Sequence, residues 1–429
     1  MLAQAWIFGF ITRQGMSIKG ERKRPDMRIA CRIAGGQSPE QSVWCRYPPQ
    51  SYHKEGKYMR IADMHCDTIS ELLRQRREQT PAAEDTTEAP AGGQSEGAAT
   101  ADMQPGLGQN TCHVDLRKMQ KSGYVLQNFA LFVNLGKVKD AWQEVQKLRA
   151  LYEEELQKNQ DIIVPVYSYA DIEKNLADGK ISAMLTVEEG GVCGGRTERL
   201  RELYKQGVRM MTLSWNYKNE LGHPNLYAEL RNSIRAEEPH LTSEEQDYAL
   251  QKYLNTPDTE HGLTKKGREF VECMEEMGMI VDVSHMSDAG FFDVLQMTKK
   301  PFVASHSNAR ALCPCTRNLT DDMIRALAAK GGVAGLNFCA DFLSPCRAGV
   351  KNPGTIADIV RHASHMVKIG GEDFVGLGSD FDGIDTHAEL PGADCMDRLF
   401  AALKKNGFTE RQIDKIFCKN VMRLYREVL

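Results

Sequence analysis

The sequence predicts an α/β fold, specifically a (β/α)8 TIM barrel of the metal-dependent hydrolase type. Eight short apolar segments rich in β-branched residues are mostly separated by segments with helical spacing. Their near-continuous apolar character suits parallel strands buried on both faces. Histidines or carboxylates stand at the carboxyl ends of five of the eight segments. A doubly wound open sheet is the alternative, but no GxGxxG motif follows the first segment.

The expected strands alternate with helices, as a barrel requires. In chain order, the strands are residues 59–67, 124–133, 181–188, 208–215, 278–285, 301–307, 331–338 and 374–382. The clearest helix is residues 137–158, in which apolar residues recur at helical spacing. Thr264 and Thr320 are expected N-caps, and Thr409 with Gln412 forms a capping box for a last helix that runs to Tyr425.

Two stretches lie outside this alternation. Residues 1–58 show no sustained period and are expected to form an irregular N-terminal extension before the barrel domain, 59–429. Because Met59 directly precedes the first strand, it is a candidate start codon. Residues 78–110 are rich in Ala, Gly, Pro, Thr and Glu, a composition that cannot bury a core. We therefore expect a disordered insert there.

Composition narrows the classes of function. The chain has 429 residues, 41% of them hydrophobic, and a net charge of −4, which gives no electrostatic basis for nucleic-acid binding. No apolar run reaches transmembrane length, and the first residues make a poor signal peptide. The 12 cysteines are scattered, as is typical of reduced thiols. We expect a cytoplasmic protein without a nucleic-acid or membrane partner; a homodimer is an option that no segment supports.

Polar residues at the strand ends are the main functional signal. Alternate strand residues share a face, so His65 and Asp67 converge at the end of the first strand. The third strand ends in a glutamate, the fifth and sixth in histidines and the eighth in aspartates: Glu188, His285, His306, Asp380 and Asp382. In a (β/α)8 barrel these ends form one rim, the face that carries active sites.

The donor types indicate a metal centre. Histidine nitrogens with carboxylate oxygens suit zinc best, while manganese, cobalt or iron are alternatives. Five ligands exceed the needs of one tetrahedral ion that keeps an open position, and they suit two ions with a bridging carboxylate. Two ions about 3.5–4 Å apart can polarise a carbonyl and hold a hydroxide at neutral pH. The sequence therefore predicts metal-assisted hydrolysis.

Two further residues are candidates for handling substrate. Asp380, in GLGSDFDG, could take and return a proton beside bound water, with a turn-capping role as the alternative. Arg317, in CTRNLTDD, follows the sixth strand and could bind a substrate carboxylate bidentately. An ordinary surface arginine is an equal alternative for Arg317. Asp382 is expected to be structural.

Other histidines and cysteines are expected to have structural roles. His362 and His365 lie on a helix before the eighth strand, where they would pack or cap. Strand alternation turns Cys66 away from its neighbouring ligands. A lone CxC at residues 313–315 is a weak metal motif, and His113 could reach the rim, although nothing in the sequence fixes its place.

Taken together, the separated motifs resemble the membrane (renal) dipeptidase family. The resemblance rests on DMHCDT, TVEEGG, DVSH, ASHS, TRN and GLGSDFDG, in that order, and covers Met59 to the C-terminus apart from residues 78–110. It implies a barrel with two zinc ions per chain. His65 and Asp67 would bind one ion, His285 and His306 the other, and the bridging carboxylate would be Glu188, with its neighbour Glu189 pointing away.

The same resemblance implies a substrate class. It assigns Arg317 to the substrate carboxylate, Asp380 to proton transfer, and dipeptides to the active site, including those with a C-terminal D-residue. Trp215 is a departure, because renal members carry a histidine there that contacts the substrate and its developing oxyanion. Substrate preference is therefore open. The rival interpretations are another amide or lactone hydrolase, for example on N-acyl amino acids, and a catalytically silent metal- or peptide-binding protein.

Overall fold

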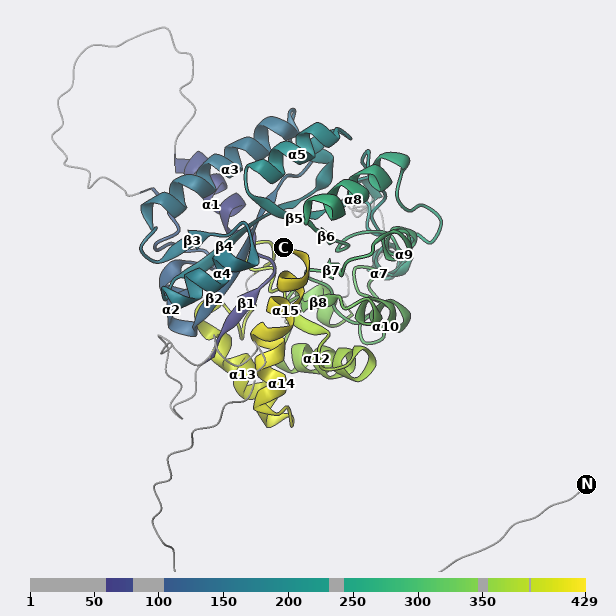
Figure 1. The fold of residues 1–429 in the computed structure, drawn as a ribbon. Coiled ribbons are helices and arrows are strands. Elements are labelled where there is room, and N and C mark those ends of the chain that lie inside the picture. The colour runs from purple at the N-terminus through teal and green to yellow at the C-terminus, as the bar shows by residue number, and fades with distance from the viewer. Residues whose placement is uncertain (1–58, 80–103, 231–242, 346–353, 386) are drawn as a thin grey trace, which may run out of the picture. The chain divides into compact units, whose positions relative to one another are not determined.

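The computed structural model describes residues 59–79, 104–230, 243–345, 354–385 and 387–429. Within these residues, eight parallel strands close into a barrel surrounded by helices (Figure 1), which confirms the predicted (β/α)8 fold. The predicted N-terminal extension, residues 1–58, lies outside the described part of the chain. Residues 80–103, most of the predicted insert, lie outside it as well.

All eight predicted strands are present, in the order β2-β1-β9-β8-β7-β6-β5-β4, and pairing of β2 with β4 closes the barrel. Their bounds are β1 Ile61–Asp63, β2 Tyr124–Phe132, β4 Ile181–Glu188, β5 Val208–Thr212, β6 Ile280–Asp282, β7 Val303–Ala304, β8 Val333–Leu336 and β9 Val375–Leu377. Every residue of β4 and β5 is buried, as expected for strands between barrel core and helices. A ninth strand, β3 (Ile163–Pro165), was not predicted and pairs with β4 outside the closed barrel.

The helices follow the strands and cover the barrel. They are α1 Thr68–Gln79, α2 Leu116–Ser122, α3 Ala141–Lys158, α4 Tyr169–Ala177, α5 Thr197–Lys205, α7 Ser243–Asn255, α8 Lys265–Met277, α9 Asp288–Met297, α10 Asp321–Ala329, α11 Ala340–Leu343, α12 Ile356–Gly370, α13 Met396–Lys405, α14 Glu410–Asp414 and α15 Asn420–Val428. The three predicted threonine caps are confirmed: each hydroxyl accepts from the backbone N–H three residues later. The last helical stretch is longer than predicted and contains a π-helical turn, Lys415–Lys419, between α14 and α15.

The two described ends of the predicted insert are structured. Residues 78 and 79 complete α1, and Leu107 is fully buried in the core. The buried carboxylate of Glu155 accepts a hydrogen bond from the Leu107 backbone N–H at 2.6 Å and pairs with Arg76 at 2.5 Å. One apolar side chain and one buried carboxylate thus fix a segment whose composition is otherwise typical of disorder.

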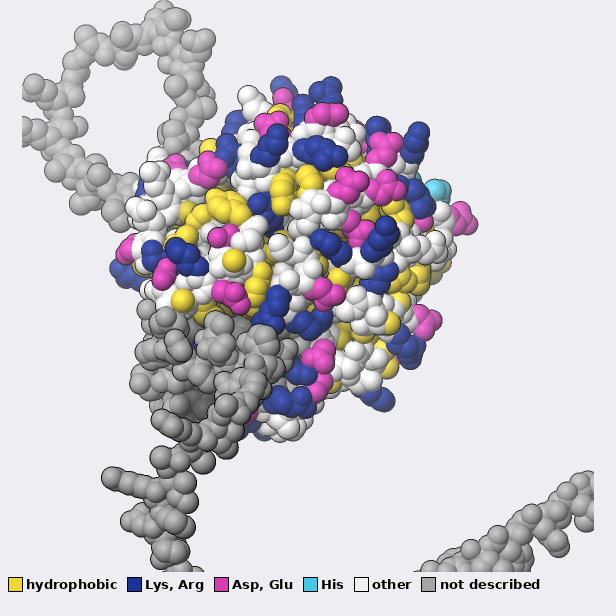
Figure 2. Space-filling model, in the orientation of Figure 1, with side chains coloured by type: hydrophobic (Ala, Val, Ile, Leu, Met, Phe, Trp, Pro, Cys, Tyr) yellow, Lys and Arg dark blue, Asp and Glu magenta, His cyan; other side chains and the backbone are white. Residues whose placement is uncertain are grey.

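The face shown in Figure 2 interleaves basic and acidic side chains without an extended region of one sign. Among the described helices, none is both long enough and apolar enough to span a bilayer. A cavity of about 350 Å³ borders β3 and is lined by residues such as Tyr152, Tyr167 and Gly207. None of the predicted site residues lines that cavity, so the strand-end site is separate from it.

Candidate metal centre

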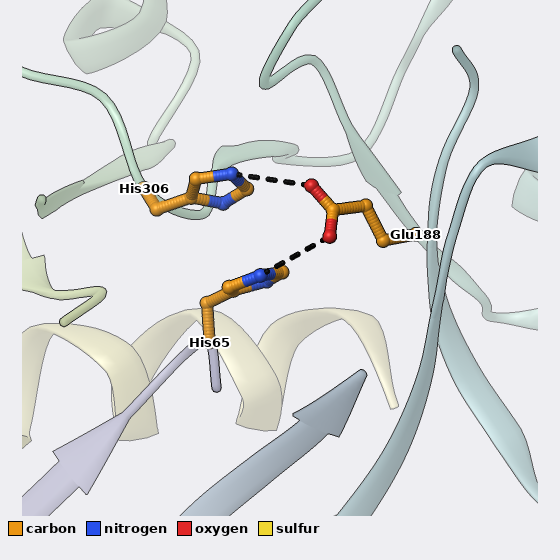
Figure 3. A group of neighbouring side chains, drawn as sticks. All are labelled: His65, Glu188 and His306. Atoms are coloured by element: carbon orange, nitrogen blue, oxygen red, sulfur yellow. Dashed lines mark ion pairs between the residues drawn. The ribbon is translucent and has the colours of Figure 1, made fainter. Parts of the chain in front are cut away.

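The barrel brings the five predicted ligands into one buried group at the carboxyl ends of its strands. Glu188 is the last residue of β4, while His65 and His306 follow β1 and β7 by two residues and His285 follows β6 by three. All of these side chains are nearly inaccessible to solvent, as is Asp67 after β1. In Figure 3 the rings of His65 and His306 face the two oxygens of Glu188.

Glu188 divides the group into two halves. Its Oε2 lies 3.4 Å from His65 Nε2, whereas its Oε1 lies 3.0 Å from His285 Nε2 and 3.6 Å from His306 Nε2. On the His65 side, Nε2 is also 3.5 Å from Asp67 Oδ2 and 3.8 Å from Asp380 Oδ1. Each carboxylate oxygen of Glu188 therefore faces a different set of ligand atoms.

Buried polar atoms in both halves fit bound cations. His65 Nε2 and Asp67 Oδ1 are buried without a hydrogen-bond partner, which is costly unless another charge or donor is supplied. On the other side, the Nε2 atoms of His285 and His306 approach each other at 3.0 Å. Nitrogen and carboxylate donors in this arrangement are ligands for a borderline divalent ion.

Two aspartates at strand ends set the backbone around the ligands. Asp63 Oδ1 accepts from the backbone N–H of His65 at 3.2 Å and of Ser379 at 3.0 Å, which joins the end of β1 to that of β9. Asp282 Oδ1 accepts from the N–H groups of Ser284 and Ser305 at 3.0 and 2.9 Å, which joins β6 to β7. Both aspartates are fully buried.

Hydrogen bonds behind two histidines determine which ring nitrogen faces the centre. Ser305 Oγ donates to Asp282 Oδ2 at 2.6 Å, so it accepts from His306 Nδ1–H at 2.7 Å. His285 Nδ1 likewise donates to Asn216 Oδ1 at 3.0 Å. With their protons on Nδ1, both rings direct an Nε2 lone pair toward Glu188, as metal ligands do.

Burial and mutual charge shift the ionisation of the centre in the absence of an ion. Burial, together with the neighbouring carboxylates, raises the pKa of Glu188 to about 7 and that of Asp380 to about 6. Burial also lowers the pKa values of His285 and His306, with Arg317 and His65 adding to the effect. For His65, burial opposes protonation of the ring, but the negative charges of Glu188 and Asp67 outweigh this effect and raise its pKa. A bound cation would favour the ionised form of these buried carboxylates.

A sequence model of the membrane dipeptidase family (peptidase family M19) matches residues 53–237 and 240–429. The chain belongs to this family. It is therefore a hydrolase that acts on dipeptides with a metal cofactor.

The chain is also similar to individual proteins and to a solved structure. An uncharacterized protein from the pqqA 5′ region of Klebsiella pneumoniae is 35% identical over 263 residues, which cover 61% of this chain and 87% of that protein. The dipeptidase tcpJ of Claviceps purpurea is 28% identical over 335 residues, 74% of this chain and 69% of its own. A Rhodobacter sphaeroides metallopeptidase crystallised with a phosphinate mimic of L-Ala-D-Ala shares the fold, with a TM-score of 0.70, 23% identity, and coverage of 87% of this chain and all of that one.

Arg317 and Trp215 of this dipeptidase both lie beside the ligands. The Arg317 guanidinium is buried, donates to Ser307 Oγ and the His306 carbonyl, and leaves its Nε without a partner. The half-buried Trp215 ring packs 6.0 Å from the His285 ring, centroid to centroid. The geometry places both predicted substrate residues at the rim, and the surface alternative for Arg317 is wrong.

The residues expected to be structural have structural contacts. Glu189 points away from the ligands, since its carboxylate accepts from the N–H groups of Gly191 and Trp215 and from Asn219. Asp382 accepts from the Thr68 hydroxyl and from the His113 backbone N–H. Likewise, His362 and His365 make hydrogen bonds on the outer layer, and the thiol of Cys66 contacts the Asn128 carbonyl.

Reasoning from the sequence missed the residues that hold the ligands in place. Asn216 and Asn337 are two of these: the first bonds to His285, and the second donates to Asp380 Oδ2 at 2.9 Å. Neither has a distinctive motif. The repeated pattern of a strand-ending aspartate just before a histidine, DMH and DVSH, was a usable signal for Asp63 and Asp282.

Proposed function

We propose that this metallopeptidase is a binuclear zinc dipeptidase whose substrates include dipeptides with a C-terminal D-residue. The observation that carries the proposal is the position of Glu188, because each of its two carboxylate oxygens faces a different set of ligand atoms. His65 and Asp67 would hold one ion, and His285 and His306 the other. Zinc at such a site supplies Lewis acidity toward a carbonyl and makes water a nucleophile at neutral pH.

The chain itself supplies proton transfer through Asp380. This carboxylate lies 3.8 Å from His65 Nε2 and is oriented by Asn337. A carboxylate placed beside a metal-activated water is suited to take and return its proton. Asp380 takes a proton at Oδ1 from the attacking water and delivers it to the nitrogen of the leaving amine as the C–N bond breaks.

Arg317 positions the substrate. A buried guanidinium with an unused Nε–H is suited to a carboxylate, since the fork of N–H donors matches two carboxylate oxygens. Holding the C-terminal carboxylate beside the ligands limits hydrolysis to very short peptides. Support for a C-terminal D-residue comes from the Rhodobacter sphaeroides relative, which was crystallised with the mimic of L-Ala-D-Ala. The Trp215 ring would contact the substrate near His285.

Metal analysis combined with a substrate panel tests this proposal. Purified protein is assayed for zinc by elemental analysis and for hydrolysis of L-L and L-D dipeptides, before and after chelation. Zinc in the centre together with chelator-sensitive cleavage of both dipeptide classes is the expected result. Loss of zinc in a His65→Ala or His285→Ala variant would tie the ions to the two halves.

Other outcomes separate the rival functions. Bound zinc without dipeptide cleavage, but with hydrolysis of an N-acyl amino acid or a lactone, would overturn the substrate class and leave the centre intact. Zinc and peptide binding without turnover of any of these would indicate a binding protein. A single zinc ion in the centre would contradict the bridging role of Glu188.

A further inference from the structure

A second group of metal-ligating side chains lies outside the centre. Within the described part of the chain, His223, Asp258 and His261 offer one ligand atom each, all within 4.8 Å of one another. His223 follows β5 in a connecting segment, and the other two precede α8. None of the three takes part in the dipeptidase centre described above.

A chain of hydrogen bonds fixes the proton positions in this group. The Tyr227 hydroxyl donates to Asp258 Oδ2 at 3.0 Å, so its oxygen must accept from His223 Nδ1–H at 2.9 Å. His261 Nδ1 lies 3.1 Å from both oxygens of Asp258 and donates to that carboxylate. Both imidazoles therefore carry the proton on Nδ1 and keep the lone pair on Nε2. This is the tautomer in which histidines backed by a carboxylate bind metal ions.

The group is also held in place before any ion binds. The rings of His223 and His261 stack with 5.0 Å between centroids and an interplanar angle of 22°. The backbone N–H of Asp258 donates to Asn225 Oδ1 at 3.0 Å, and Ser287 Oγ donates to the His261 carbonyl at 2.6 Å. Binding of an ion would thus cost little free energy for ordering these loops.

An ion can reach the group from solvent. The side chain of His261 is 60% exposed, whereas that of Asp258 is 15% exposed. Ligand atoms on a tetrahedral zinc ion lie roughly 3.4 Å apart for bonds of about 2.1 Å. The two imidazole rings stack with 5.0 Å between their centroids, so the exposed His261 ring needs only a small movement toward His223 to bring both Nε2 atoms onto one ion.

We propose that His223 and His261 bind one divalent ion of borderline hardness through their Nε2 atoms, with Asp258 as the carboxylate that orients both rings. Zinc is the natural probe, because two imidazoles with a carboxylate suit it well. The bound ion links the segment after β5 to the segment before α8. Because Pro224 pairs with Met286 and the Ser287 N–H donates to the His223 carbonyl, the link braces the chain directly after His285.

Zinc titration of the full chain tests the proposal. Metal-free protein is first given two equivalents of zinc, which fill the tighter dipeptidase centre, and further zinc is then added in a calorimeter. One additional ion should bind to the wild type with micromolar or tighter affinity. His223→Ala and His261→Ala should abolish this binding, while Tyr227→Phe, which keeps the ring but removes the link to Asp258, should weaken it about 10-fold.

His365→Ala is the matched control. His365, in α12, is another partly exposed histidine bound to an aspartate, Asp321, but the neighbouring imidazole of His362 is buried and has both ring nitrogens in hydrogen bonds. This variant should keep the additional ion, and all of the variants should still hydrolyse dipeptides, which shows that they fold. An additional ion that is absent from the wild type, that persists in both His223→Ala and His261→Ala, or that disappears in His365→Ala would overturn the proposal.

Discussion

At the level of single residues, hydrogen bonds behind the ligands determine what the ligands can do. A neutral histidine can carry its proton on either nitrogen, and only one tautomer turns a lone pair toward the centre. The Ser305 hydroxyl fixes the tautomer of His306, and Asp282 fixes the direction of that hydroxyl; all three residues are buried. The serine is therefore as much a part of the metal site as the imidazole that it orients.

Replacing Ser305 with alanine should weaken zinc binding while leaving the fold intact. Without the hydroxyl, Asp282 no longer reaches His306, so the ring is free to adopt the wrong tautomer. Loss of such a partner typically costs about 10- to 100-fold in metal affinity. Zinc affinity measured by competition with a chromogenic chelator checks this prediction. Ser364→Ala on α12, where the hydroxyl caps only a helix carbonyl, is the control and should bind zinc normally.

Replacing Arg317 with alanine should raise KM for dipeptides and leave zinc content unchanged. In the proposed function the guanidinium attracts the substrate carboxylate, but it is not one of the proposed metal ligands. Charge-assisted hydrogen bonds of this kind contribute about 1.5–3 kcal/mol each, so KM should rise at least about 10-fold. Steady-state kinetics with elemental analysis on the same samples decide the matter. Arg325→Ala, an exposed arginine on α10, is the control; an unchanged KM in Arg317→Ala would exclude the anchoring role.

At the level of secondary-structure elements, α12 is attached to the active rim through one buried histidine. His362 Nδ1 accepts from the Ala309 backbone N–H at 3.1 Å, and its Nε2–H donates to the Leu343 carbonyl at 2.9 Å. Both bonds need the neutral ring. Burial accordingly lowers the pKa of His362 from 6.5 to about 4. The attachment of this helix to the rim thus depends on pH, although the helix carries no catalytic group.

His362 should therefore make the protein less stable as the medium becomes acidic. Between pH 6.5 and pH 4 the unfolded chain binds a proton at His362 that the folded chain does not, so the contribution of His362 to the free energy of unfolding declines with falling pH. A shift of this size corresponds to about 3 kcal/mol. The buried carboxylates with raised pKa values act in the opposite direction, so a comparison between variants isolates His362. From pH 7 to pH 4.5, denaturant unfolding should show a less unfavourable change for His362→Gln than for the wild type. His365→Gln on the same helix should behave like the wild type.

Elements with strong local signals were predictable from the sequence. Threonine caps at Thr264, Thr320 and Thr409 were read correctly because a single hydroxyl satisfies a backbone N–H at a fixed offset. β3 was missed because Pro165 interrupts its apolar segment, and a proline argues against a strand paired on both sides. The order around Leu107 was missed for a different reason, since its partner Glu155 lies far away in the sequence.

At the level of the whole molecule, closure of the barrel explains why the metal ligands could be predicted at all. All eight strand ends meet on one rim, so residues that stand at strand ends in the sequence are expected to lie close together in space. The backbone turns at that rim were not predictable. His285 and Asp380 adopt φ values of 70° and 63°, a region that costs non-glycine residues about 1–3 kcal/mol, and no glycine marks either position.

Removing the metal should destabilise the whole barrel. Ions held by the proposed ligands would join strands β1, β4, β6 and β7, and they would offset the repulsion between the buried carboxylates of Asp67, Glu188 and Asp380. An ion at about 1,000 times its Kd stabilises a fold by about 4 kcal/mol. Chelation should lower Tm by several degrees, and added zinc should restore it, as measured by calorimetry. Chelator saturated beforehand with zinc is the control and should leave Tm unchanged.

A closed barrel has no free strand edge, yet β3 provides one. Among the described strands it pairs only with β4, and the Val166 N–H, just beyond it, donates to the Ala183 carbonyl. Alternation then turns the nitrogen of Pro165 to the open side, where proline has no hydrogen to offer another chain. The short length of β3 and the missing N–H of Pro165 both disfavour pairing of this edge with another molecule, the first step of β-aggregation.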